Sequence, residues 1–212
     1  MLWATGAVMS TVALLVAVVK APWAQWRSRP ERQHALFAAV LGLALFWQLK
    51  VSISGLLALH PLVMMTVVMV FGPSLGMITG ALALGLATLL AGAPWLPLGP
   101  QMLLTVVVPA LAAQGVLKVV ERVPGRNLFV YMLGGGFLGA MVTVQAMALA
   151  TWCYVRVLGP APLLVDVASH YYLTLLMMFP EGFINGALVS MLTVFRPELV
   201  RTYDDHHYLD GH

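Results

Sequence analysis

The chain has 212 residues, of which 61% are hydrophobic and only 9% are charged, and its formal net charge is +3. The cations lie in short clusters between long apolar runs, so the sequence offers neither a nucleic-acid-binding surface nor a soluble catalytic domain. The composition indicates an all-α integral membrane protein embedded in a lipid bilayer. We expect a single polytopic membrane domain over residues 1–200 and a His/Asp-containing tail over 201–212.

Long apolar runs predict about seven transmembrane helices, over residues 2–19, 35–50, 52–71, 75–91, 101–120, 128–155 and 171–195. A helix perpendicular to the membrane needs about 20 residues, so the shorter runs indicate tilted helices, with a partly re-entrant piece near 52–60. Gly72 and Pro73 predict a tight turn between the third and fourth helices. Glycines four residues apart predict close helix packing at three pairs: Gly76 and Gly80, Gly135 and Gly139, Gly182 and Gly186.

The distribution of positive charge predicts the orientation, because cytoplasmic loops accumulate Lys and Arg. Nine of the eleven cations fall on one side of the predicted spans: Lys20, Arg27, Arg29, Arg32, Lys118, Arg122, Arg126, Arg196 and Arg201. The first apolar run resembles a signal peptide, but its positive charges follow the apolar core, so we expect a retained first helix. The sequence thus predicts an outside N-terminus and a cytoplasmic C-terminal tail in a bacterial inner membrane.

Sequence motifs for catalysis are missing. No zinc-protease, nucleophile-elbow or Walker-type motif occurs, so we expect no enzyme and no nucleotide hydrolysis by this chain alone. Because the chain has no motif for nucleotide hydrolysis, active transport would require another subunit.

Cys153 is the single cysteine and forms no intrachain disulfide.

Glu181 is the most informative residue, because it lies in the middle of the last apolar run. Counting from Tyr171 at the helical rise places it roughly 15 Å deep in a hydrocarbon core of roughly 30 Å. Acids at that depth usually face a cavity, a partner or an ion. Polar and thioether side chains share its helical face and predict a substrate path: Thr174, Met177, Met178 and Asn185. The alternative is a structural ion pair between Lys50 and Glu181.

His60 begins the third predicted helix near the outer surface, with Met64 one turn further on. Imidazole and thioether ligands suit late first-row transition metals or copper(I), so we predict a metal site from His60, Met64 and Glu181. Methionine is also an ordinary core residue, which is the alternative for Met64. Asp166 and His170 lie at the outer mouth of the last helix, where they either collect a cation or form a solvated loop.

Several segments resemble the cobalt/nickel-type energy-coupling-factor permeases, the CbiM-like substrate-binding membrane subunits. These segments are Gly55-Leu56-Leu57-Ala58-Leu59-His60-Pro61, Phe71-Gly72-Pro73, Phe179-Pro180-Glu181-Gly182-Phe183-Ile184-Asn185-Gly186-Ala187 and Arg196-Pro197-Glu198-Leu199. The similarity spans roughly residues 35–200 and is closest to a divergent bacterial branch, whose ends resemble the tail residues Tyr203-Asp204-Asp205 and Tyr208-Leu209.

The resemblance implies a seven-helix subunit that binds a divalent transition metal from outside and works with a coupling permease and an ATPase. In the cobalt and nickel members, the amino-terminal nitrogen, a histidine at position two and a mid-chain histidine hold the metal. His60 matches the mid-chain ligand, whereas this chain begins Met1-Leu2-Trp3 and lacks the second-position histidine. Nickel, cobalt and copper(I) all stay open as the transported ion. Two alternatives remain: a haem or electron-transfer protein using His60 and His170, and an accessory membrane protein without transport activity.

Overall fold

The computed structural model describes residues 1–52, 58–123 and 127–203, and this part of the chain is helical apart from two very short strands. Its first half contains α1 (Leu2–Lys20), α2 (Trp23–Arg27), α3 (Pro30–Phe46), β1 (Val51–Ser52), β2 (Ala58–Leu59), α4 (Met64–Phe71) and α5 (Pro73–Leu90). Its second half contains α6 (Leu98–Met102), η1 (Leu103–Val107), α7 (Val108–Val120), η2 (Val130–Leu138), α8 (Gly139–Leu158), α9 (Ala161–Ser169), α10 (Tyr171–Phe195) and η3 (Pro197–Leu199).

Among the described residues, five helical stretches are long and apolar enough to cross a membrane: Leu2–Lys20, Pro73–Leu90, Leu98–Val120, Val130–Leu158 and Tyr171–Phe195. They correspond to five of the seven predicted spans. The other two predicted spans coincide with α3, which has 17 residues, and with the region that ends in α4, which has only eight. A total of seven crossings therefore remains a prediction.

The prediction of one helix over 52–71 is wrong. The backbone of β1 pairs antiparallel with β2, and α4 begins only at Met64. Pro61 has no amide hydrogen, and Val63 adopts a left-handed backbone with φ of 57°, so the helix does not extend back through this segment. The irregular backbone agrees with the re-entrant piece expected here, although residues 53–57 of the resembling segment lie outside the described residues.

Helix α4 lies at the centre of the molecule. All eight of its residues are buried, with α5, α7, α8 and α10 packed around it. Gly72, with φ of 80°, ends α4, and Pro73 opens α5, which confirms the predicted turn. A helix this short and fully enclosed must receive its polar partners from its neighbours.

The predicted glycine contacts are confirmed, and methionines of α4 fill the space beside several of them. A Cβ atom built on Gly80 would lie 2.9 Å from the Met64 sulfur, and one on Gly139 would lie 3.0 Å from the Met65 methyl group. In the same way, a Cβ on Gly182 would meet the Phe137 ring at 3.1 Å. These glycines let side chains of neighbouring helices approach closely, as small residues do in membrane helix packing.

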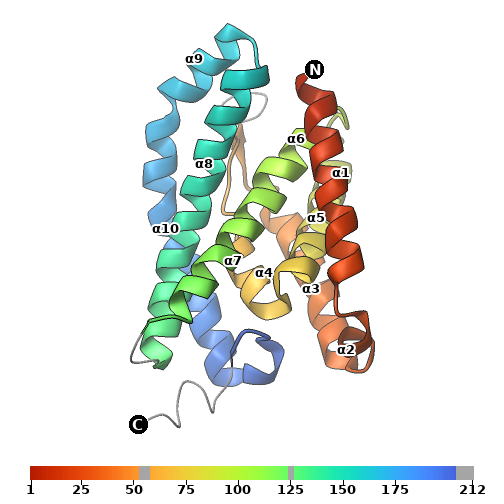
Figure 1. Ribbon diagram of the computed structural model, residues 1–212, viewed down its shortest axis with the longest axis vertical. Coiled ribbons are helices and arrows are strands. Elements are labelled where there is room, and N and C mark those ends of the chain that lie inside the picture. Colours follow the sequence, from red (N-terminus) through yellow and green to blue (C-terminus); the bar gives the residue numbers. More distant parts are fainter. Residues whose placement is uncertain (53–57, 124–126, 204–212) are drawn as a thin grey trace.

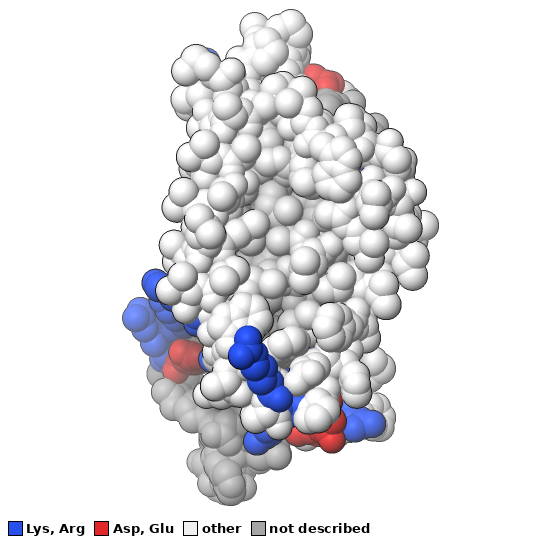
Figure 2. Space-filling view, turned by 90° about the vertical axis from the view of Figure 1, so that its right-hand side faces the viewer, with Lys and Arg blue, Asp and Glu red and all other residues white. Residues whose placement is uncertain are grey.

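Lys and Arg side chains gather at one end of the molecule, while the broad middle of the face in Figure 2 carries no charged side chain. Helix α1 begins at the opposite end from the one where α10 ends (Figure 1). Large apolar side chains remain exposed along α1 and α10, including Val12, Leu15, Leu176 and Phe183. An uncharged band flanked by a basic end is the surface expected of a membrane-embedded chain.

We expect Gly80→Ala to destabilise the fold, because its new methyl group would lie 2.8 Å from Val106. Overpacking of this kind costs about 1–3 kcal/mol. Gly85→Ala on the same helix is the matched control, since nothing lies within 4 Å of its Cβ position and alanine is the better helix former. Thermal unfolding in detergent compares the two variants, and equal midpoints would contradict the close contacts of Gly80 with Val106 and Met64.

Candidate functional site

The Glu181 carboxylate is enclosed completely and binds the backbone at the start of α4. One carboxylate oxygen accepts a hydrogen bond from the Leu62 amide at 2.7 Å, and the other accepts one from the Val63 amide at 2.6 Å. The second oxygen also accepts a hydrogen bond from the Asn185 side-chain amide at 2.8 Å. An anion at the N-terminus of a helix satisfies amides that have no partner within the helix and interacts favourably with the helix dipole.

Asn185, one turn after Glu181 on α10, extends this interaction to the first turn of α4. Its side-chain oxygen accepts hydrogen bonds from the Thr66 amide at 3.0 Å and from the Thr66 hydroxyl at 2.8 Å. Its nitrogen donates to the Glu181 carbonyl as well as to the carboxylate. The two side chains therefore act together, and α10 binds three backbone amides at or just before the α4 N-terminus, those of Leu62, Val63 and Thr66.

The C-terminal end of α4 is bound by the segment that follows α10. The Arg201 amide donates to the Val70 carbonyl at 3.1 Å, while the amide and hydroxyl of Thr202 both donate to the Met69 carbonyl, at 3.2 and 2.9 Å. The Thr202 hydroxyl also lies 2.7 Å from the Tyr131 hydroxyl. One stretch of chain thus supplies an acid to the N-terminus of α4 and backbone and hydroxyl donors to its C-terminus.

His60 lies immediately before the segment that Glu181 binds. Its ring is buried beside the Trp47 indole, with the ring centres 5.5 Å apart, and its Nδ1 lies 3.2 Å from the Pro61 carbonyl oxygen. Because that carbonyl only accepts, Nδ1 donates, and the lone pair of the neutral ring resides on Nε2. The Trp47 Nε1–H donates to the carbonyls of Pro61 at 3.0 Å and Leu62 at 3.3 Å, so it fixes the same short segment.

The predicted substrate-path residues lie along one side of α10 but differ in environment. Thr174 is fully buried, and its hydroxyl donates to the Tyr171 carbonyl at 2.6 Å. The Gln145 side chain on α8 donates to the Thr174 carbonyl at 3.1 Å and contacts the Met178 sulfur at 3.6 Å, whereas Met177 is half-buried. These contacts tie α10 to α8, and a role of this face in ion passage remains a prediction.

The considered ion pair between Lys50 and Glu181 is not formed. Lys50 is exposed beyond the end of α3, while both oxygens of Glu181 already accept backbone hydrogen bonds. At the outer mouth, His170 and Asp166 do come together, with Nδ1 of the histidine 3.2 Å from the carboxylate and 2.8 Å from the Asp166 carbonyl. Both are partly exposed, but the solvated-loop alternative is wrong for Asp166, which lies within α9.

Within the described residues, no three His, Cys, Asp or Glu side chains are grouped closely enough to hold a metal ion. Met64 is fully buried against Gly80, the arrangement of a core residue. The tail histidines His206 and His207 lie outside the described residues. Sequence reasoning missed Trp47, which lies near the end of the apolar run predicted over 35–50 and is buried beside His60.

The fold and this polar arrangement define a polytopic helical membrane protein in which a short internal helix is held at both ends by one long helix and its extension. A family model described as the cobalt uptake substrate-specific transmembrane region, CbiM, matches residues 1–199. The chain belongs to this family, which confirms the resemblance seen in the sequence. No curated protein matches the chain, and no solved structure does.

We expect Glu181→Gln to destabilise the protein, although the substitution keeps the shape of the side chain. The glutamine NH₂ group would face a backbone N–H, because both carboxylate oxygens are acceptors here. Loss of a charge-assisted hydrogen bond of this kind costs about 1.5–3 kcal/mol. Thermal unfolding in detergent measures the effect, with Glu121→Gln at an exposed position as control. An unchanged midpoint would show that the carboxylate does not hold α4.

Proposed function

We propose that the chain is the substrate-binding membrane subunit of an energy-coupling-factor transporter that takes up a divalent transition-metal ion, with cobalt as the first candidate. Membership of the cobalt uptake family supports transport, and it makes a haem protein or a purely accessory role the less economical explanation. In this proposal the chain lies in a bacterial inner membrane, with its basic end in the cytoplasm and His60 toward the outside.

The observation that carries the proposal is the orientation of the His60 imidazole. Metal-binding histidines almost always donate their second ring N–H to a carbonyl or carboxylate, which fixes the ring and the tautomer. His60 does so through Nδ1 to the Pro61 carbonyl, which makes Nε2 the ligand atom. Imidazole nitrogen suits cobalt, nickel, copper and zinc, so the ring alone does not select among them.

In this proposal, Glu181 is a positioning residue. Its carboxylate is occupied by the Leu62 and Val63 amides, two and three residues beyond His60, and so it anchors the segment that carries the ligand. Met64 acts in packing rather than coordination, because its sulfur faces the Gly80 position on α5. Other ligands would come from solvent or from groups that converge when the ion binds.

We expect His60→Ala to lower the Co²⁺ affinity of the purified chain by at least about tenfold, since loss even of an outer-shell partner of a metal ligand costs that much. Equilibrium binding to Co²⁺, Ni²⁺, Zn²⁺ and copper(I) gives the measurement. His34→Ala, at an exposed position on α3, is the matched control and should bind as the wild type.

Unchanged affinity for all four ions in His60→Ala would remove the proposed site. The same preparation tests the haem alternative, because a Soret absorption band that His60→Ala abolishes would favour a haem ligand over a transport ligand.

We expect uphill metal uptake only when the chain is produced together with an ATP-hydrolysing subunit and a coupling permease, because no nucleotide-binding motif occurs in the sequence. Accumulation of radioactive cobalt in cells gives the measurement, with an ATPase variant that lacks its phosphate-binding lysine as the control. Equal accumulation by the chain alone would point to a stand-alone carrier.

A further inference from the structure

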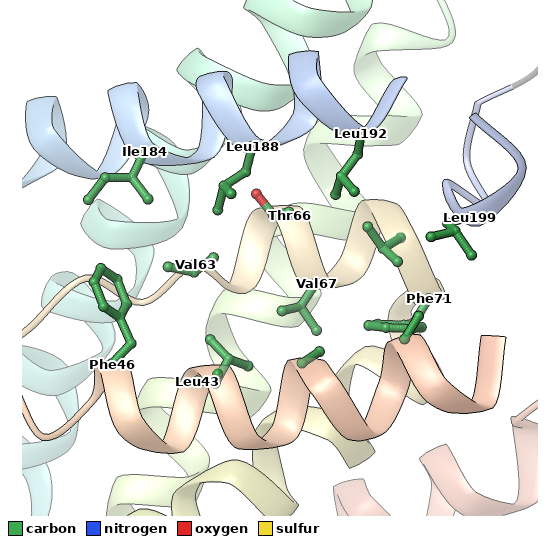
Figure 3. Close-up of a pocket in the computed structure, with 14 residues that line it drawn as sticks. Leu43, Phe46, Val63, Thr66, Val67, Phe71, Ile184, Leu188, Leu192 and Leu199 are labelled. Atoms are coloured by element: carbon green, nitrogen blue, oxygen red, sulfur yellow. The ribbon is translucent and has the colours of Figure 1, made fainter. Parts of the chain in front are cut away.

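An apolar groove runs along α4 between α3 and α10 (Figure 3). Its volume is about 580 Å³, and its walls come from side chains such as Ala39, Gly42 and Phe46 on α3 and Leu188 and Leu192 on α10. The hydroxyl of Thr66 is the polar group that Figure 3 shows beside it, and this hydroxyl already donates to Asn185. The groove therefore offers a purely apolar environment to whatever fills it.

The groove ends at the basic end of the molecule, beside a small pocket whose mainly apolar lining includes two arginines. Val70, Phe71 and Leu199 line both spaces, and the small pocket adds Trp26, Arg32 and Arg201. An apolar channel that ends at two guanidinium groups and an indole has the polarity pattern of a lipid: a long apolar part and an anionic head.

Two side-chain donors in the small pocket have no hydrogen-bond acceptor. Among the described residues, the buried side-chain nitrogens without a hydrogen-bond acceptor are Trp26 Nε1 and Arg32 Nε. The neighbouring Trp23 differs, because its Nε1 donates to the Val18 carbonyl at 2.8 Å. Buried donors without an acceptor destabilise the folded protein. A bound group that supplies an acceptor to this pocket would therefore stabilise it.

Within the described part of the chain, no carboxylate pairs with the guanidinium groups of this pocket. Burial and repulsion from Arg29 and Arg201 lower the pKa of the Arg32 guanidinium. The Arg32 and Arg201 guanidinium groups donate to the carbonyls of Glu198 and Phe71, each at 3.4 Å, while the Glu198 carboxylate lies 3.4 Å from Arg196. An anion bound between Arg32 and Arg201 would relieve this repulsion.

We propose that the groove holds one acyl chain of an anionic phospholipid, whose phosphate binds Arg32, Arg201 and Trp26 at the basic end. The small pocket has a volume of about 20 Å³, enough for about one water molecule and too little for a phosphate group. The phosphate therefore lies at its mouth on the guanidinium edges, and one water joins it to the buried indole and Arg32 Nε. The predicted orientation puts this lipid in the inner leaflet.

The size of the groove favours a lipid chain over a helix from a partner protein. A helix with its side chains is about 10–12 Å across, and one that followed α4 and α3 through the membrane would fill several times the volume of this groove. An acyl chain is flexible and narrow enough to lie between Gly42 on α3 and Leu188 on α10. We therefore assign the groove to a lipid chain. Binding of a partner helix in the groove would contradict this assignment.

Competitive lipid binding tests the head-group site. The delipidated chain in detergent is mixed with equal amounts of phosphatidylglycerol and phosphatidylcholine, and native mass spectrometry counts the retained lipids. We expect about tenfold preference for phosphatidylglycerol, lost in Arg32→Gln/Arg201→Gln and kept in Arg27→Gln/Arg122→Gln, which removes two exposed charges of the same end. Equal preference in the two double variants would overturn the proposal.

Trp26→Phe is a second test of the head-group site, which does not depend on correct folding of Arg32→Gln/Arg201→Gln. It keeps the ring contacts with Trp23 and Phe37 but removes the buried Nε1 donor, so we expect a severalfold loss of preference with unchanged thermal unfolding in the absence of lipid. Phosphatidylglycerol should raise the unfolding midpoint of the wild type more than that of Trp26→Phe. Identical stabilisation of both proteins would contradict the head-group assignment.

Filling the groove tests the acyl-chain site. Nothing lies within 4 Å of a Cβ on Gly42 or on Gly85, but only Gly42 lines the groove. We expect Gly42→Leu to retain severalfold less of both lipids and Gly85→Leu to bind as the wild type, with Co²⁺ affinity unchanged in both. If Gly42→Leu keeps its lipid but no longer co-purifies with the coupling permease, the groove receives a protein helix and the proposal is wrong.

Discussion

The structure depends on one constraint: a helix of eight residues is enclosed within a membrane protein, and half of its backbone polar groups have no partner within the helix. The first four amides and last four carbonyls of any helix have no partner inside the helix. In α4 these groups are half of all backbone polar groups, and at membrane depth each one left unpaired costs several kcal/mol. Helix α10 and its extension supply the missing partners through Glu181, Asn185 and the segment at Thr202.

This constraint also explains why a β-branched residue adopts a left-handed backbone. Val63 precedes α4 with φ of 57°, a conformation that costs of order 1–3 kcal/mol for a residue of this kind. The Val63 amide donates to the carboxylate at 2.6 Å, and Trp47 donates to the carbonyls just before it. The strained turn therefore persists because its neighbours bind it, and the position of the adjacent His60 ring depends on where α10 holds its acid.

The sequence predicted some of these features well and others poorly, and the reason is the kind of partner involved. The bounds of α10 and the importance of Glu181 followed directly from an acid inside a long apolar run. The partners of Glu181 could not be predicted, because residue types do not show that the backbone amides of Leu62 and Val63 point toward it. Lys50 was considered as its partner because it carries the opposite charge. The helix predicted over 52–71 begins too early for the same reason, since apolar residue types do not reveal where the backbone turns, whereas its end at Phe71 is correct.

A short central helix also fixes where space remains. Because α4 covers only part of the distance that α10 spans, α3 and α10 face each other across it without closing, and the groove is the volume left between them. The walls of this space are almost entirely apolar and the space opens to the outside of the molecule, so acyl chains solvate it better than water does. The bilayer supplies acyl chains at every point of that opening. The short helix that fixes the position of His60 therefore also leaves the space that we propose for a lipid chain.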